Sequence, residues 1–362
     1  MILLAPGPVN VSPRVTAAMG RGDLCHREPE FAALLESVRA KLVRALAPAG
    51  DWVAVPLTGS GTLALEAGVS SAVAHGRKML VVVNGVYGER ILEMAQTHGI
   101  ATVVLRSDWG HPPELDAIAA ALRADPAIEV VALVHHETTT GLLNPVAEVG
   151  RIVREHGRVL FVDAISGLAG DEMRLEEWGV GICVGVANKC IQGLPGIGFV
   201  LARRGEMARM NSIPARSVYM HLPRHFAAHE KKTVPFTAAV QVLYALDEAL
   251  DELLEEGVAA RIARYARAAA QLRAGFERLG LKLMLPLGLR SNSITTLSLP
   301  SGLGYRELHD RVRADGFVIY EGQGQLSSEM FRVANMGALG EDDFARFLSS
   351  LERAIDGAEV AR

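Results

Sequence analysis

Residues 158–189 read RVLFVDAISGLAGDEMRLEEWGVGICVGVANK and contain two short apolar runs, RVLFVD at 158–163 and GICVGVAN at 181–188. Runs of this kind, rich in β-branched residues, are typical of strands buried on both faces, as in a parallel sheet covered by helices. Each run ends in a polar group, Asp163 in the first and Asn188-Lys189 in the second. The stretch therefore predicts two buried strands with polar side chains at the edge of the sheet where they end.

The same pattern extends on both sides of this stretch. Further apolar runs are KMLVVVN at 78–84, ATVVL at 101–105 and EVVALVH at 129–135, and amphipathic segments closed by glycine lie between the runs. This alternation, from about residue 29 to 245, predicts an α/β architecture. GIGFVLARR at 196–204 follows the last run after a short turn, so we expect an antiparallel return strand there.

The order of the expected helices and strands changes in the last third of the chain. A long helical stretch over about 237–279 precedes a series of expected strands and helices: LKLML, SITTLSL, YRELHDRVRADG, FVIY, MFRVANM and EDDFARFLSSLERAI. This is an α+β pattern, and 362 residues are too many for one ordinary core. We expect an N-terminal arm over 1–15, a large domain over 16–257 and a small domain over 258–362.

The amino-acid composition and charge of the chain argue against several classes of protein. The chain has 49% hydrophobic and 22% charged residues, a net charge of -4, and Lys and Arg scattered along helical stretches, which argues against nucleic acid or an anionic membrane as a partner. The N-terminus has no basic region before its apolar stretch, and no apolar run reaches the ~18 residues of a membrane span. The three cysteines have no metal-ligand spacing. We expect a cytoplasmic protein without a metal site.

Four polar clusters follow apolar runs and should meet at one edge of the sheet, since ligands of open α/β sheets bind beyond the carboxyl ends of the strands. The clusters are Thr58-Gly59-Ser60-Gly61-Thr62, His136-Glu137-Thr138-Thr139-Thr140-Gly141, Asp163, and Ala187-Asn188-Lys189. The expected meeting of all four clusters at one edge indicates a ligand-binding site more strongly than any single cluster does.

Each cluster also has an ordinary interpretation. The glycine-rich turn is either a helix N-cap or an anion site, and it matches neither the Walker A loop nor the dinucleotide fingerprint. Asp163 is either an N-cap or a buried carboxylate that keeps a heteroaromatic nitrogen protonated. Lys189 is either a solvated strand end or a buried amine that forms a Schiff base. An anion site, an aspartate and a lysine together are the parts that a pyridoxal phosphate site requires.

These motifs resemble the class V aminotransferases of the fold-type I pyridoxal-phosphate superfamily nearly from end to end. The strings that carry the resemblance are LLAPGPVNVSPRV, GSGTLALEA, NGVYGER, HHETTTGLLNP, FVDAISGLAG, ANKCIQGLPGIGFVLARR and FRVANMG. Within that family, ANKCIQGLPGIGFV and HxETTTGxLNP are most similar to the 2-aminoethylphosphonate–pyruvate transaminases. The resemblance implies a large domain with a mostly parallel seven-stranded sheet between helices and a smaller α+β domain.

The resemblance also implies the site. Lys189 and Asp163 would be catalytic, and Gly7 and Arg332 would bind the substrate, Arg332 as a two-point clamp for an acidic group. The physical alternative for Arg332 is a surface residue at a strand edge. The cofactor, pyridoxal 5'-phosphate, would be bound by Ser60, Gly61, Thr62, Tyr87, Thr138, Asp163, Asn188, Lys189 and Thr233, with Thr233 reaching the site of the neighbouring subunit of a homodimer.

Two departures from the family pattern fall near the substrate. His221 stands where relatives carry an acidic residue, and could add positive charge at mildly acid pH or be only a surface residue. Glu230 stands where a cofactor-contacting tyrosine is common. The resemblance nevertheless implies a small-molecule amino donor and a keto acid, 2-aminoethylphosphonate and pyruvate. The alternatives are an alanine–glyoxylate or serine–pyruvate type transaminase and an enzyme for a related phosphonate.

Two other classes fit less well. A cysteine desulfurase needs a cysteine in a late loop, and no cysteine follows Cys190. A cofactor-binding regulator would need an added DNA-binding module, for which no segment is spare.

Overall fold

A seven-stranded sheet forms the centre of the molecule in the computed structural model, which describes residues 1–359. Its strand order is β2-β10-β9-β8-β5-β3-β4. In that order the strands span Trp52–Thr58, Ile197–Arg203, Val180–Val186, Val159–Asp163, Ile128–Val134, Lys78–Val83 and Ala101–Arg106. Neighbours are parallel except at β10, which runs antiparallel to both β9 and β2. The predicted mostly parallel sheet and its antiparallel return strand are confirmed.

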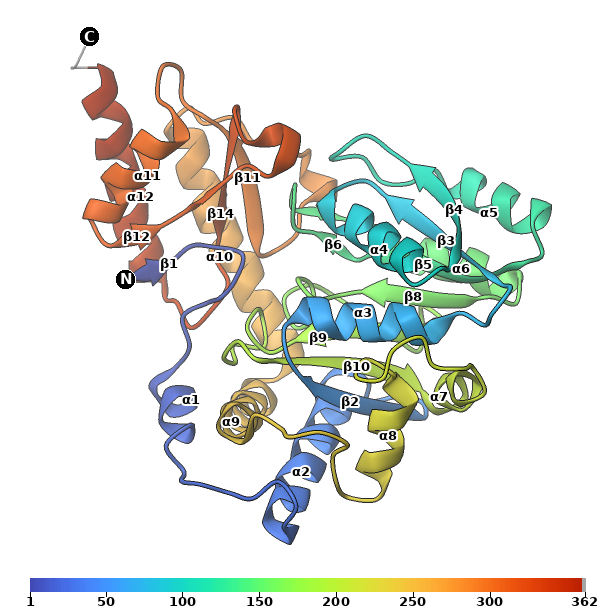
Figure 1. Cartoon of the computed structure of the whole chain (residues 1–362). Helices are drawn as coiled ribbons and strands as arrows, with labels where there is room; N and C mark the ends of the chain where they lie inside the picture. The colour runs from blue at the N-terminus through green and yellow to red at the C-terminus, as the bar shows by residue number, and fades with distance from the viewer. Residues whose placement is uncertain (360–362) are drawn as a thin grey trace.

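Helices cover both faces of this sheet (Figure 1). One face packs against α2 (Pro29–Leu46), α5 (Leu115–Ala124), α6 (Val146–Glu155) and α9 (Val240–Glu256). The other packs against α3 (Gly61–Ala72), α4 (Val86–Thr97), α7 (Arg204–Asn211) and α8 (Leu222–Glu230). Burial on both faces explains why the strands read as continuous apolar runs rather than as alternating ones.

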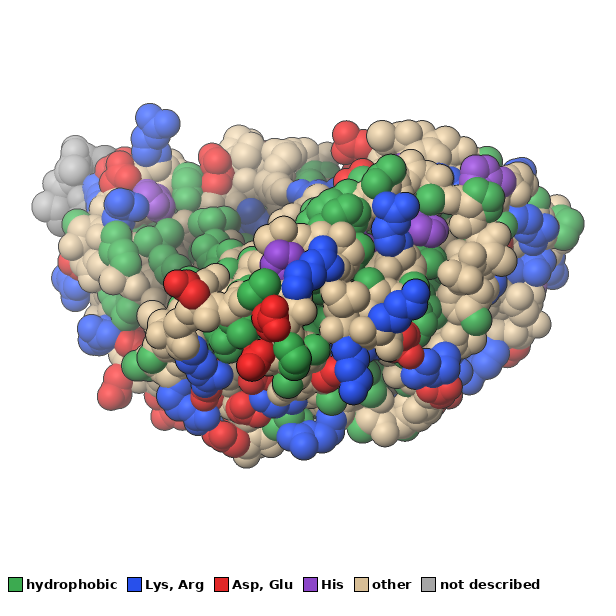
Figure 2. All heavy atoms as spheres, turned by 60° about the horizontal axis from the view of Figure 1, so that its bottom comes forward, with side chains coloured by type: hydrophobic (Ala, Val, Ile, Leu, Met, Phe, Trp, Pro, Cys, Tyr) green, Lys and Arg blue, Asp and Glu red, His purple; other side chains and the backbone are tan. Residues whose placement is uncertain are grey.

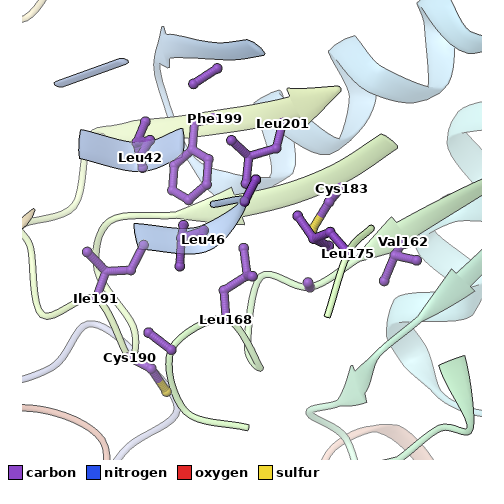
Figure 3. Close-up of a cluster of buried hydrophobic side chains, with 14 of the residues drawn as sticks. Leu42, Leu46, Val162, Leu168, Leu175, Cys183, Cys190, Ile191, Phe199 and Leu201 are labelled. Carbon is purple, nitrogen blue, oxygen red and sulfur yellow. The ribbon is translucent and has the colours of Figure 1, made fainter. Parts of the chain in front are cut away.

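The core beneath α2 illustrates this packing. Leu42 and Leu46 of α2 lie over Phe199 and Leu201 of β10, with Cys183 of β9 in the same apolar cluster (Figure 3). Cys183 is fully buried and acts as a small apolar side chain. The neighbouring edge strand β2 contains Pro56, which an edge strand tolerates because one side of its backbone needs no ladder donor.

A second, smaller core surrounds a three-stranded antiparallel sheet in the order β11-β14-β13. These strands span Ile294–Ser298, Met330–Ala334 and Tyr320–Glu321, and the helices beside them are α10 (Val258–Arg278), α11 (Tyr305–Ala314) and α12 (Glu341–Glu359). The N-terminal strand β1 (Ile2–Leu3) pairs in parallel with β12 (Phe317–Val318). The blue start of the chain therefore lies against its orange-to-red end in Figure 1.

Two expectations for this part of the chain are wrong. LKLML at 281–285 is no strand, because it meets β11 only at the bridge between Leu283 and Leu297 before Pro286 interrupts the backbone donors. The single strand expected for FVIY is divided, since β12 pairs with β1 whereas β13 pairs with β14.

The long helical stretch is also divided, at Gly257, whose φ of +85° favours glycine. α9 ends before this residue and packs on the large sheet. α10 begins after it, contributes Tyr265 to the large core, and packs in the smaller core from Ala268 onward. The division of the chain into an arm over 1–15 and domains over 16–257 and 258–362 stays a prediction.

The surface carries mixed charge. On the face drawn in Figure 2, Lys and Arg side chains lie among Asp and Glu side chains. Lys41 of α2 pairs with Asp247 of α9 at 2.7 Å, and Arg14 of α1 (Pro13–Ala18) pairs with Glu248 at 2.7 Å. Within residues 1–359, no helix combines the length and apolarity that a membrane crossing requires.

Candidate active site

A cavity of about 830 Å³ lies between the carboxyl ends of the parallel strands and the β13–β14 edge of the small sheet. Six of the residues predicted to bind the cofactor line it: Ser60, Gly61, Thr62, Tyr87, Asn188 and Lys189. Gly7 and Arg332, predicted to bind the substrate, line it as well. Strand ends far apart in sequence therefore meet at one place, as expected for an open α/β sheet.

The glycine-rich turn places the N-terminus of α3 at the cavity wall. Ser60 is the N-cap, and its Oγ accepts a 3.2 Å hydrogen bond from the Leu63 amide. A Cβ on Gly61 would lie 3.1 Å from Ile165 Cδ1 and 3.2 Å from Val186 Cβ, so a larger residue would make tight contacts with both side chains. The turn is thus a helix cap that also presents backbone donors and a positive dipole end to the cavity.

Lys189 follows β9 and is only 9% exposed, so it is not a solvated strand end. Its Nζ donates a 2.9 Å hydrogen bond to Ser166 Oγ, and that hydroxyl also hydrogen-bonds to the buried Thr138 Oγ1. Burial lowers the pKa of the Lys189 amine to about 8. A lysine with this pKa holds much of its amine in the neutral, nucleophilic form near pH 8.

Asp163 ends β8 with 2% of its surface exposed. No helix follows it before β9, so it is not a helix N-cap. Its Oδ1 accepts a 3.0 Å hydrogen bond from the Ile165 amide, whereas its Oδ2 has no partner among the described residues. Burial raises the pKa of this carboxyl to about 6. A buried carboxylate oxygen without a partner indicates that a donor is missing from the site.

Tyr87 reaches the cavity from the first turn of α4, which Glu137 anchors. The buried Glu137 carboxylate accepts hydrogen bonds from the Tyr87 and Gly88 amides at 3.4 and 3.3 Å, and from Thr139 Oγ1 at 2.6 Å. The negative charge thus sits at a helix N-terminus, where the dipole favours it. The Arg90 guanidinium lies 4.7 Å from the centre of the Tyr87 ring and also lines the cavity.

Arg332 lies in the central strand of the small sheet and is 6% exposed, so it is not a surface arginine at a strand edge. Its Nε donates to the Glu321 carbonyl at 3.0 Å. Its Nη1 donates to the Thr138 carbonyl at 3.0 Å and to Gln323 Oε1 at 3.1 Å. Among the described residues only Nη2 has no acceptor. The expected two-point clamp is therefore reduced to one free guanidinium nitrogen in this geometry.

The N-terminal segment closes the cavity beside the lysine. Gly7 has a φ of +109°, and a Cβ there would lie 3.2 Å from the Asn188 carbonyl oxygen and 3.3 Å from Lys189 Cγ. Glycine is needed both for the backbone conformation and for the close approach.

Three of the predicted cofactor-binding residues, Thr138, Asp163 and Thr233, do not line this cavity, and neither do Glu230 and His221. Thr233 lies in the turn after α8, where its Oγ1 accepts a 3.2 Å hydrogen bond from Arg27. Glu230 is exposed and pairs with Arg39 at 2.6 Å. His221 caps α8, and burial followed by the charge of Arg224 lowers its pKa. The positive charge considered for His221 at mildly acid pH is therefore disfavoured.

Further residues at the site were not predicted, among them Ser166, Arg90 and Gln323, and Glu137 was expected at this edge of the sheet but without a role. Ser166 lies three residues beyond the strand end at Asp163, a position that the strand-end argument could have found. Gln323 lies in a loop of the small sheet and reaches the site only through tertiary packing, so no local pattern marks it.

The groups present fit pyridoxal phosphate. The unpartnered Asp163 oxygen suits a protonated ring nitrogen, the buried Lys189 amine suits an aldehyde, and the N-terminus of α3 suits a phosphate. The Tyr87 side chain in the same cavity offers an aromatic surface.

Comparison with known proteins agrees with this assignment. The family model "Aminotransferase class-V" matches residues 12–309. The chain is 39% identical to a 2-aminoethylphosphonate–pyruvate transaminase of Syntrophobacter fumaroxidans, an alignment that covers 98% of this chain and 96% of the relative.

Solved structures share the whole fold. An aspartate aminotransferase of subgroup IV from Thermus thermophilus superposes with a TM-score of 0.91 at 28% identity, over 99% of this chain and 100% of the other. An alanine–glyoxylate aminotransferase from Nostoc sp. gives a TM-score of 0.92 at 27% identity, over 98% and 95%. The chain belongs to the class V aminotransferases, fold-type I enzymes that use pyridoxal phosphate to move an amino group between an amino donor and a keto acid.

Proposed function

We propose that this aminotransferase transfers the amino group between 2-aminoethylphosphonate and pyruvate, giving phosphonoacetaldehyde and alanine. The observation that carries the proposal is the buried Arg332, which lines the same cavity as Lys189 and has one guanidinium nitrogen without an acceptor among residues 1–359. An arginine so placed suits a phosphonate on the donor and a carboxylate on pyruvate. Full-length relatives that are 39% and 38% identical carry the name of this activity.

Most of the site would serve the cofactor. In this proposal Ser60, Gly61 and Thr62 would hold the phosphate, with Asn188 nearby, and Tyr87 would contact the ring. Thr138 would serve the ring's phenolic oxygen, and Asp163 would keep the ring nitrogen protonated. The bound cofactor supplies an electron sink for the carbon that carries the amino group.

The remaining chemistry belongs to the protein. The neutral Lys189 amine would hold the cofactor and would take the proton from the amino-bearing carbon of the donor. Ser166 orients that amine through its 2.9 Å hydrogen bond. Arg332 holds the acidic group of the substrate, which directs the amino group toward Lys189, and Gly7 lets the N-terminal segment exclude water from that side.

The proposal includes a homodimer with shared sites. Thr233 does not line its own cavity, and it lies in a surface turn from which it can face another subunit. We assign it to the phosphate site of the partner.

The test is a comparison of kcat/KM for 2-aminoethylphosphonate, alanine and serine, with pyruvate or glyoxylate as the acceptor. We expect 2-aminoethylphosphonate with pyruvate to be the fastest pair. Arg332→Ala should weaken both half-reactions by roughly 2–5 kcal/mol, because it removes a buried charge partner. Inert 2-aminoethylphosphonate beside fast alanine or serine with glyoxylate would refute the phosphonate and leave the transaminase class.

A further inference from the structure

Gln323 and Arg332 both line the cavity and are joined by a hydrogen bond. Its side-chain oxygen accepts the 3.1 Å hydrogen bond from Arg332 Nη1. A guanidinium only donates hydrogen bonds, so the oxygen of the Gln323 amide must face Arg332 and its NH2 must face away. The orientation of this amide is therefore fixed by chemistry.

The backbone around Gln323 is held in place on both sides. The Gly322 amide donates to the Met330 carbonyl at 2.8 Å, and the Gln323 carbonyl accepts from the Leu326 amide at 3.1 Å. A Cβ on Gly322 would lie 2.2 Å from the Leu326 carbonyl oxygen, so only glycine fits there. The loop therefore holds the Gln323 side chain against Arg332 instead of letting it extend into solvent.

Two donors remain without acceptors at this point of the wall. Among residues 1–359, neither Arg332 Nη2 nor Gln323 Nε2 hydrogen-bonds to another group. The guanidinium and the amide are joined through Nη1 and Oε1, so these two donor groups belong to one rigid unit. N–H groups on two joined side chains of the cavity wall, one of them positively charged, suit two oxygens of one acid.

We propose that Gln323 is a substrate-binding residue whose NH2 donates to one oxygen of the substrate's acidic group while Arg332 Nη2 donates to another. This inference rests on the proposed function, since it assigns the acid of both substrates to the same place. The amide replaces the second guanidinium nitrogen, which Arg332 has committed to Thr138 and Gln323 itself. Both a carboxylate and a phosphonate offer the two acceptor oxygens that this pair needs.

The test compares Gln323→Leu with Gln323→Glu in the holoenzyme. Leucine removes both the acceptor and the donor, whereas glutamate keeps the acceptor for Arg332 and removes the donor. Kinetics of each half-reaction, followed by cofactor absorbance, separate KM from kcat. Binding of the unreactive acids ethylphosphonate and propionate is measured in parallel. Gln325→Leu, an exposed glutamine in the same loop, is the matched control.

We expect both Gln323 variants to raise KM and the dissociation constants of the inert acids about 10- to 100-fold, the effect of losing one hydrogen bond to a charged group. The kcat should change little, and Gln325→Leu should behave as wild type. Wild-type binding by Gln323→Glu would mean that the glutamine only positions Arg332, and unchanged binding in Gln323→Leu would remove any role. Either result would overturn the inference.

The proposed function and the inference about Gln323 can be tested independently of each other. If the wild type does not react with 2-aminoethylphosphonate, the same variants can still be compared with pyruvate and alanine, which also carry an acid.

Discussion

The Lys189 amine donates its one hydrogen bond among the described residues to the hydroxyl of Ser166, at 2.9 Å. Ser166 comes from the loop after β8, and Lys189 follows β9, so the contact joins the ends of two adjacent strands. A hydroxyl is a neutral acceptor and compensates poorly for burying an ammonium group. The buried Lys189 amine is therefore ready to react, but its burial lowers the free energy of unfolding of the protein.

Replacing the lysine should stabilise the protein without cofactor. The fall of the Lys189 pKa from 10.5 to about 8 corresponds to at most about 3 kcal/mol. The folded protein carries this penalty fully below pH 8, and the penalty is relieved as pH rises from about 8 to 10.5. Lys189→Met should thus be more stable than wild type at pH 7, and the difference should narrow over that interval.

Urea unfolding of both apoproteins at pH 7 and pH 9.5 measures this difference. If the difference in unfolding free energy between the two apoproteins is absent at pH 7, or widens as the pH rises, burial of the amine does not destabilise the protein.

Lys189 should be the residue that binds the cofactor covalently. Borohydride reduction of the holoenzyme followed by peptide mass spectrometry should find the cofactor on Lys189. Lys189→Ala should remain folded, bind the cofactor weakly and show no such adduct. Modification of a different lysine in the wild type would refute the assignment.

Asp163→Asn should lose most activity while the cofactor still attaches to Lys189. The amide cannot carry the negative charge that favours a protonated ring nitrogen, so the electron sink is weakened. We expect kcat to fall on the order of 10²-fold or more. Steady-state kinetics and the absorbance of the bound cofactor check the two parts, and a kcat near that of wild type would contradict the role.

Thr233 should act across a dimer. A Lys189→Ala protein mixed with a Thr233→Ala protein should regain activity, because each hybrid dimer contains one site with Lys189 and with Thr233 of the partner subunit. Each variant refolded alone is the control. Light scattering that finds an active monomer would argue against shared sites.

Much of the site could be predicted from where polar residues follow apolar runs. Asp163, Lys189 and the Ser60–Thr62 turn end strands or begin a helix, and parallel strands bring such ends together whatever the details of packing. Arg332 was predicted by the family resemblance, but its hydrogen bonds to Thr138 and Gln323 were not. Those bonds leave one nitrogen free where the sequence suggested a two-point clamp.

The strand predicted for LKLML is absent because strand pairing, like the hydrogen bonds of Arg332, depends on tertiary contacts. Four of its five residues are apolar, and Leu281 and Leu285 are buried, but burial does not require a complete ladder of hydrogen bonds. The backbone meets β11 at one bridge only. Similarly, FVIY has the composition of one strand, and its division between two sheets depends on the N-terminal β1 arriving from more than 300 residues away.

The sequence by itself determined the α/β core, the order of its elements and the chemical groups at the sheet edge, because hydrophobic periodicity and strand direction are local and repeat along the chain. Only the tertiary structure decided that Ser166 holds the Lys189 amine, and which donors of Arg332 and which oxygen of Asp163 have no partner in the described part of the chain. These properties depend on distances of about 3 Å between side chains from separate elements. Such distances are set by how the two cores pack together, which no local pattern encodes.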